Sequence, residues 1–173
     1  MESRERIRKM VFAAVLTAIA IIIPVQFGFL KVVIGPFTAT IASHVPMFLA
    51  MLISPSVAVV VGVGSALGFF ITSPPVIAAR AATHIVVGYV GAKIIDKDKN
   101  FKKATLITAP IHGILEGLMV IPFGYSFYQV IIVVAIGTIL HHFVDGSISY
   151  ALATALAKAR RTEVYDVFSN EAA

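Results

Sequence analysis

The chain has 173 residues, of which 58% are hydrophobic and only 13% are charged. Soluble domains carry about 25% charged residues, and a fold of this length leaves about a third of its chain's surface in water. A mean hydropathy of +0.93 therefore excludes an ordinary soluble enzyme, a disordered chain, a collagen and a coiled coil. The composition predicts an integral membrane protein, and the length allows one transmembrane domain.

Basic residues are the first guide to topology. The net charge is +5, and most of the basic residues fall in three short clusters, at residues 4–9, 93–103 and 158–161. Each cluster lies beside an apolar stretch, which is the pattern of cytoplasmic loops in membrane proteins. No basic face is interleaved with aromatic residues, so we expect no nucleic-acid partner. If all three clusters lie in the cytoplasm, the number of membrane crossings between neighbouring clusters is even.

The apolar stretches predict an all-α fold, an integral membrane bundle of six transmembrane helices with both the N- and C-termini cytoplasmic. A membrane-spanning helix needs about 20 residues, so four helices fit between the first two clusters and two between the second and third. Proline and glycine mark the turns. The six expected helices cover residues 10–27, 37–53, 57–71, 76–95, 104–121 and 127–159. Residues 1–161 then form a single domain, and residues 162–173 form a polar C-terminal tail that we expect to fray.

Charged side chains inside a bilayer cost several kcal/mol and mark functional sites. Arg80, Glu116 and Asp145 fall within the expected helices, and so do all five histidines. Arg80 and His84 are four residues apart and share a helix face. His112 and Glu116 share a face of the next helix, at a similar depth near the outer surface. We therefore expect these two pairs to line a polar pocket that opens to the outside.

The outer loops add aromatic and hydrogen-bonding residues above this charged floor, a combination that suits a small polar ring compound. The expected substrate-binding residues are Arg80, His84, Glu116, His112, Gln26, Tyr125, Tyr128 and Gln129. Two other interpretations stay open. The arginine and the glutamate could simply neutralise each other, and the tyrosines could belong to the aromatic belt at the membrane interface.

Three further polar residues lie deeper in the last expected helix. His141 and Asp145 are four residues apart, and His142 and Asp145 are three apart, so each pair shares a helix face. Residues at this spacing can hold a metal ion, and they can equally satisfy one another in a packed interior. We expect no metal and no cofactor; an intramembrane metal-binding protein or metalloenzyme that uses these three residues is the alternative. Catalytic and nucleotide-binding motifs are absent from the sequence, so we do not expect an enzyme.

The first expected helix follows a basic segment and carries Ala-Ala-Val-Leu-Thr-Ala at residues 13–18. With six short spans and this chain length, the sequence resembles the S components of energy-coupling factor (ECF) vitamin transporters. The resemblance implies a substrate-capture subunit of an ABC importer in a prokaryotic plasma membrane, with a transmembrane coupling subunit and two ATPase subunits as partners. It also implies that Ala14 and Ala18 contact the coupling subunit, and that a water-soluble vitamin binds near the outer face.

Two stretches, residues 42–50 and 80–84, look like the niacin-type S components. Nicotinate agrees chemically, because Arg80 can pair bidentately with its carboxylate and a tyrosine can stack on its ring. Glu116 would repel that carboxylate unless it is protonated or held by Arg80 or His112. Thiamine or its pyrimidine precursor, pyridoxine and a queuosine precursor therefore stay open as alternative substrates.

Overall fold

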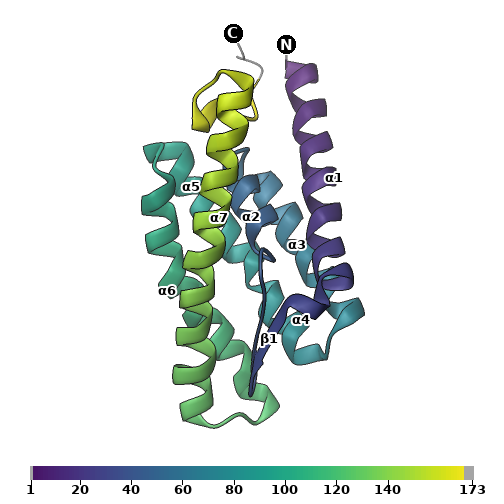
Figure 1. The fold of residues 1–173 in the computed structure, drawn as a ribbon, viewed down its shortest axis with the longest axis vertical. Helices are drawn as coiled ribbons and strands as arrows, with labels where there is room; N and C mark the ends of the chain where they lie inside the picture. The colour runs from purple at the N-terminus through teal and green to yellow at the C-terminus, as the bar shows by residue number, and fades with distance from the viewer. Residues whose placement is uncertain (1, 170–173) are drawn as a thin grey trace.

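The computed structural model describes residues 2–169, and its main feature is a bundle of long helices (Figure 1). Within these residues, five helical segments are long and apolar enough to cross a membrane. They are α1 (Glu2–Gln26), α3 (Pro55–Thr72), α4 (Pro75–Ala82) continued by α5 (His84–Asp98), α6 (Phe101–Val120) continued by η2 (Ile121–Phe123), and the π-helix η3 (Gln129–Ala135) continued by α7 (Ile136–Arg160). The chain is therefore a multi-pass membrane protein.

Several helices begin at a side-chain N-cap or end at a residue in the left-handed conformation. Ser54 accepts a hydrogen bond from the backbone N–H of Val57 at the start of α3, and Asn100 accepts one from Lys103 at the start of α6. Such N-caps satisfy backbone donors that the first helical turn leaves free. Lys99 and Arg161 adopt left-handed conformations just after α5 and α7. These C-terminal stops place the basic clusters at the ends of helices.

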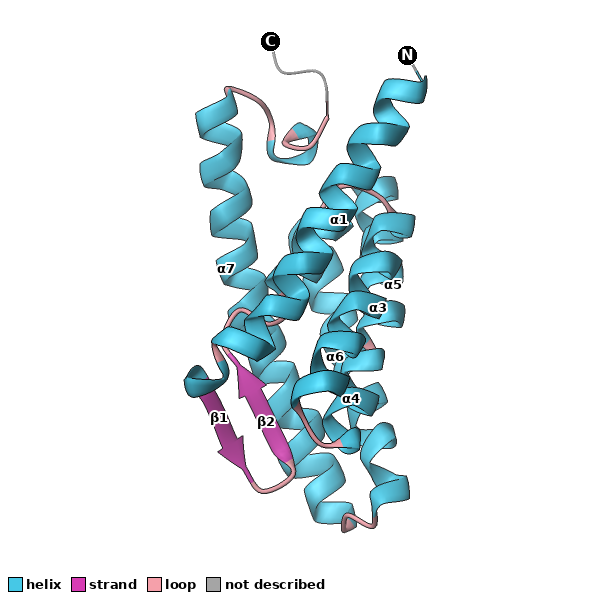
Figure 2. Cartoon of the chain, turned by 90° about the vertical axis from the view of Figure 1, so that its right-hand side faces the viewer, coloured by secondary structure: helices cyan, strands magenta, loops and turns pink. Residues whose placement is uncertain are grey.

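The prediction of one long helix over residues 37–53 is wrong. A short turn, η1 (Gly28–Leu30), leads into an antiparallel hairpin of β1 (Lys31–Ile34) and β2 (Phe37–Thr40), and only α2 (Val45–Met51) is α-helical within the expected range. The strands are rich in β-branched residues, which favour extended backbone. Gly35 turns the hairpin with a φ of +54°, a conformation that glycine adopts readily. Figure 2 shows the hairpin beside the helices.

The expected fourth helix is broken in the middle. Both the backbone N–H of Thr83 (3.0 Å) and its hydroxyl (2.7 Å) bind the carbonyl oxygen of Arg80, which tightens the last turn of α4 before α5 begins at His84. The break lies between two of the expected site residues. It sets the direction in which each of them enters the bundle.

The tail after α7 folds back onto the bundle as far as it is described, instead of fraying. It forms η4 (Val164–Asp166), followed by Val167 and Phe168, which are 1% and 8% exposed. The Phe168 ring packs edge-on against Phe12 at 5.1 Å between centroids. Arg160 donates to the carbonyl oxygen of Val167 at 2.6 Å. Residues 170–173 of the expected tail lie outside the described residues.

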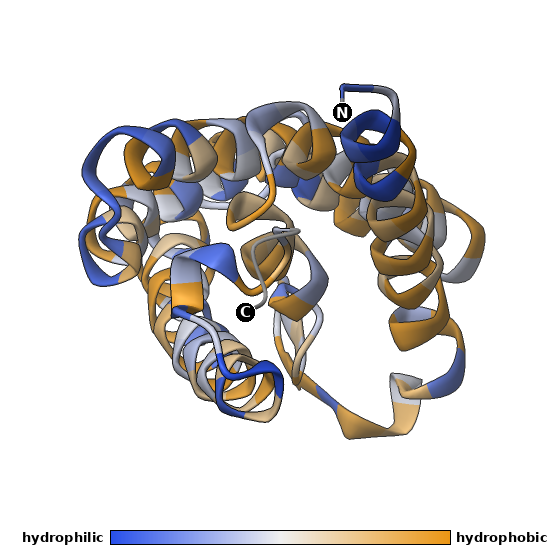
Figure 3. Ribbon diagram, turned by 90° about the horizontal axis from the view of Figure 1, so that it is seen from above, coloured by the Kyte–Doolittle hydropathy of each residue, from blue (hydrophilic) through white to orange (hydrophobic). Residues whose placement is uncertain are grey.

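The start of α1 and the end of α7 lie at one end of the bundle, and the turn between α5 and α6 lies toward the same end (Figure 1). Figure 3 looks onto this end, where hydrophilic residues gather at the start of α1 and around the ends of neighbouring helices. The tip of the β1–β2 hairpin points toward the opposite end (Figure 2). The three basic clusters of the sequence therefore share one end of the molecule.

Helices α1 and α3 pack closely because α3 presents glycines to α1. A Cβ atom on Gly68 would lie 2.9 Å from the Cα of Ile21, and one on Gly64 would collide with the side chain of Thr17. Small residues allow this approach of two helices in a membrane. Ala14 and Ala18 are both exposed on α1.

Candidate functional site

A buried ion pair between α4 and α6 forms the centre of the candidate site. Arg80 donates from Nε (2.9 Å) and Nη2 (2.6 Å) to Oε2 of Glu116, and the two side chains are 4% and 5% exposed. Thr138 of α7 donates its hydroxyl to the same oxygen at 2.5 Å. These three donors saturate Oε2 and leave the other carboxylate oxygen of Glu116 for different partners.

The remaining donors of Arg80 bind the β1–β2 hairpin. Nη1 donates to the carbonyl oxygen of Pro36 (3.1 Å) and to Oγ1 of Thr38 (3.3 Å), and Nη2 donates to the carbonyl oxygen of Thr38 (3.3 Å). The guanidinium carbon lies 5.5 Å from the centre of the Phe37 ring, within cation–π range. The hairpin thus offers Arg80 the oxygen acceptors that a bound carboxylate would otherwise provide.

A small polar cavity adjoins this arginine. Its volume is about 20 Å³, and its lining includes Thr38, His44, Arg80, His84, Glu116 and His141. A cavity of this size can hold about one water molecule, whereas a pyridine carboxylate is several times larger. The cavity is therefore too small for a ring compound unless the hairpin or a side chain moves.

Histidines surround the inner side of the ion pair. His112 Nδ1 lies 3.0 Å from Nδ1 of His142, whose Nε2 lies 3.1 Å from the hydroxyl of Thr108. His84 Nδ1 lies 2.8 Å from the hydroxyl of Ser65. Each of these rings is therefore oriented by a neighbour from another helix.

Asp145 of α7 holds the loop between the hairpin and α2. Its two carboxylate oxygens accept the backbone N–H groups of Ala42 (2.9 Å) and His44 (3.0 Å). The same carboxylate lies 3.1 Å from Nε2 of His141. His142 points elsewhere, toward His112, so the structure does not assemble His141, His142 and Asp145 into one metal site. The metalloprotein alternative that used these three residues is not favoured.

The expected site residues fall into two groups. Arg80, His84, His112 and Glu116 lie together in the interior. The other four lie apart from them. Gln26 is exposed at the end of α1, and Tyr128 is 65% exposed. Tyr125 packs against an apolar cluster of Val120, Val130 and Val134, and Gln129 accepts a hydrogen bond from the N–H of Ser126 at 2.9 Å. Their part in substrate binding stays a prediction.

Among the residues at the site that did not figure in the expected binding set are Thr38, His44 and Thr138. Thr38 and His44 come from the segment that was expected to be one long helix, so their approach to Arg80 and His84 was not visible. His44 did stand out as a histidine in an apolar stretch. Thr138 carries no signal beyond being one polar residue among apolar neighbours.

Comparison with known proteins agrees with the membrane fold. No family model matches the chain, and no solved structure matches it. The chain is 32% identical to the niacin transporter NiaX of Lactococcus lactis subsp. cremoris (strain MG1363) over 188 aligned residues, which cover 96% of this chain and 82% of the relative. The chain therefore belongs to the niacin-type S component family, in agreement with the resemblance found in its sequence.

Proposed function

We propose that this chain is the membrane-embedded subunit that captures nicotinate for an ECF-type importer. The observation that carries the proposal is the similarity to a niacin transporter over nearly the whole chain. A buried arginine beside a polar cavity supports it, since a cation shielded from water is a strong partner for a carboxylate.

Arg80 is the proposed partner of the nicotinate carboxylate. Its Nη1 and Nη2 groups point at oxygens of Pro36 and Thr38 on the hairpin. Nη2 carries two hydrogens, of which one binds Thr38 and the other binds Glu116. When the hairpin moves away, one N–H of Nη1 and one of Nη2 become free, while Nε and the other N–H of Nη2 still bind Glu116. The fork geometry of a guanidinium then suits two carboxylate oxygens. In this binding mode Arg80 neutralises the charge of Glu116, so the glutamate no longer repels the nicotinate carboxylate.

The proposed topology has six passages, with both termini and all three basic clusters in the cytoplasm. In that arrangement β2 and α2 together form the second passage, and the hairpin tip faces the outside. The charge distribution supports this orientation, because basic residues concentrate on the cytoplasmic side of membrane proteins.

The proposed partners are a transmembrane coupling subunit and two ATPase subunits. Ala14 and Ala18 are both exposed on α1, beside the edge that Thr17 and Ile21 pack against α3. Small exposed residues allow another helix to approach closely within the membrane. We propose this face as the contact with the coupling subunit.

Calorimetric titration of the purified protein in detergent tests the substrate. Nicotinate, nicotinamide, thiamine, pyridoxine, riboflavin and pantothenate form the ligand panel. Submicromolar binding of nicotinate but not of nicotinamide is the expected result, because the amide lacks the charge that Arg80 would pair with. Binding of a cationic ligand instead would move the recognition to Glu116 and would overturn the niacin assignment.

A further inference from the structure

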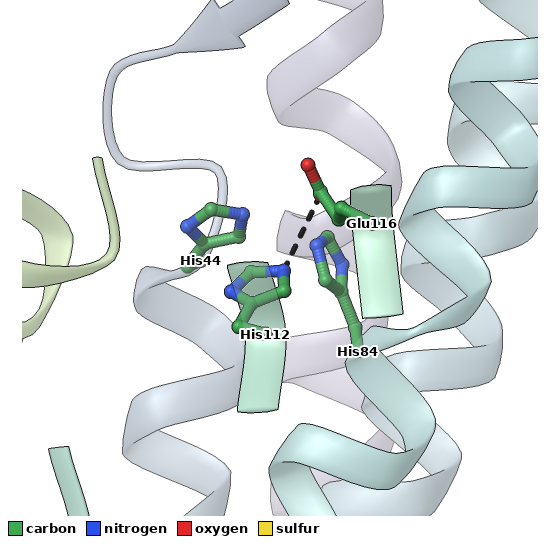
Figure 4. A group of neighbouring side chains, drawn as sticks. All are labelled: His44, His84, His112 and Glu116. Carbon is green, nitrogen blue, oxygen red and sulfur yellow. Dashed lines mark ion pairs between the residues drawn. The ribbon is translucent and has the colours of Figure 1, made fainter. Parts of the chain in front are cut away.

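Three histidines and a carboxylate converge on one point inside the bundle, as Figure 4 shows. His44 precedes α2, His84 begins α5, and His112 and Glu116 lie one turn apart on α6. One ligating atom from each of the four residues lies within 4.8 Å of the others. All four residues are at most 4% exposed. The function proposed above uses none of these histidines.

The hydrogen-bond chain behind His112 determines which of its nitrogens is free. The Thr108 hydroxyl donates to the carbonyl oxygen of Ala104 at 2.7 Å, so its oxygen accepts from Nε2–H of His142. Neutral His142 then accepts at Nδ1 from Nδ1–H of His112. A neutral His112 consequently presents a lone pair at Nε2, 3.3 Å from Oε1 of Glu116. Two lone pairs facing each other in a dry interior need a cation between them.

Each of the other two rings also has a polar neighbour on its outer side, although only that of His84 forms a hydrogen bond. His84 is held at Nδ1 by the Ser65 hydroxyl, and its Nε2 is buried without a hydrogen-bond partner among the described residues. Nδ1 of His44 lies 3.3 Å from the carboxylate of Asp145, which leaves its Nε2 for another contact. Histidines that bind metals typically donate their second ring N–H to such an outer partner, which fixes the ring and its tautomer.

We propose that His44, His84, His112 and Glu116 bind one divalent transition-metal ion of the zinc type. Three imidazole nitrogens and one carboxylate oxygen are a donor set that such ions prefer. Their bonds to the metal are about 2.0–2.2 Å long, so the four ligand atoms, now within 4.8 Å of one another, would draw together to about 3.4 Å around a tetrahedral ion. Oε1 of Glu116 is available for it, because Arg80 and Thr138 bind only Oε2.

The ion would also change the charge of the cavity. Arg80 and Glu116 cancel each other, so alone they offer an anion no surplus positive charge. A divalent ion next to Arg80 supplies that surplus and favours a ligand with one carboxylate. This consequence rests on the proposed function, whereas the metal site itself does not.

Metal binding to the full-length protein tests the site directly. The protein is purified in detergent without a histidine tag, stripped with a chelator and titrated with Zn²⁺. Co²⁺ serves as a spectroscopic probe, because its visible absorption reports a tetrahedral nitrogen and oxygen environment. We expect one ion per chain. A folded protein that binds neither Zn²⁺ nor Co²⁺ would overturn the proposal and would leave a proton on His112 in the place of the ion.

Two matched variants locate the ion. His84→Asn keeps a polar atom near Ser65 but removes the Nε2 ligand, and we expect it to weaken Zn²⁺ binding by more than about 100-fold, since loss of an outer partner alone costs about 10–100-fold. His141→Asn, in a histidine outside the four ligands, should bind Zn²⁺ as tightly as the parent protein. The opposite ranking would place the ion at His44, His141 and Asp145 and would overturn the proposed ligand set.

If His84→Asn fails to give a folded protein by gel filtration, Glu116→Gln provides the second variant. It should lower Zn²⁺ affinity to a similar extent, and unchanged affinity would contradict the ligand set. The same samples separate this proposal from the transport function. Zn²⁺ binding without nicotinate binding would remove only the niacin assignment, whereas nicotinate binding by metal-free protein that takes up no Zn²⁺ would remove only the metal site.

Discussion

Asp145 on α7 accepts a hydrogen bond from the backbone N–H of His44 at 3.0 Å, across 101 positions of sequence. Its second oxygen accepts the N–H of Ala42, whose φ of +68° is rare for a residue other than glycine. The carboxylate therefore stabilises an unfavourable backbone turn between the hairpin and α2. It links the last long helix to the segment that covers the site.

Asp145→Asn should destabilise the protein by about 1–3 kcal/mol, because the amide NH₂ would face a backbone N–H and leave a buried donor unsatisfied. The measurement is thermal unfolding in detergent, together with hydrogen exchange of residues 42–44. Exchange should rise in this turn more than in α3. Unchanged stability and exchange would show that the carboxylate does not hold the turn.

Arg80→Ala should abolish nicotinate binding and also lower stability, because it leaves Glu116 buried without its cation. Breaking a buried ion pair in this way costs about 3–5 kcal/mol. Arg80→Gln combined with Glu116→Gln removes both charges, so we expect this double variant to unfold at a higher temperature than Arg80→Ala but still not to bind. Calorimetry and thermal unfolding measure the two effects. Affinity retained within a factor of about three, or roughly 0.7 kcal/mol, would exclude Arg80 as the carboxylate partner.

Ala14→Trp should block transport and leave nicotinate binding intact, because the bulky ring would separate the exposed face of α1 from a coupling subunit. Val15→Trp is the matched control, since Val15 is also exposed on α1 but about 100° around the helix from Ala14. Uptake in cells that express the partner subunits, compared with binding to purified protein, separates the two steps. Full uptake by Ala14→Trp would remove the docking role of this face.

Gly68→Val should weaken the packing of α1 on α3, because a Cβ at this position would lie 2.9 Å from a backbone atom of Ile21. Overpacking of this kind costs about 1–3 kcal/mol. Gly28→Ala is the control, since a Cβ there meets no atom within 4 Å. Thermal unfolding should separate the two variants, and equal melting temperatures would indicate that α1 can shift without loss.

Helical spacing in the sequence was sufficient to predict that the two residue pairs on α4–α5 and α6 would lie together. Arg80 with His84, and His112 with Glu116, are each four residues apart, and the turns around them fixed their depth, so their meeting could be expected. The hairpin contribution could not, because the apolar residues from Phe37 to Ile53 fit a buried helix as well as a strand. The rotation of each helix was also invisible in the sequence. Consequently His142, which pairs with His112, could not be separated from His141.

The hydrogen bonds between Arg80 and the hairpin have a consequence for measured affinity. Pro36 and Thr38 compete with a carboxylate for the same two nitrogens, so only the fraction of molecules with a displaced hairpin is competent to bind. The apparent dissociation constant is then the intrinsic one divided by that fraction. Thr38→Val keeps both carbonyl oxygens but removes the hydroxyl that accepts from Nη1 at 3.3 Å, so it should tighten nicotinate binding although it adds no contact to the ligand. If Arg80 binds the carboxylate as proposed, the hairpin is an intramolecular competitor of the ligand.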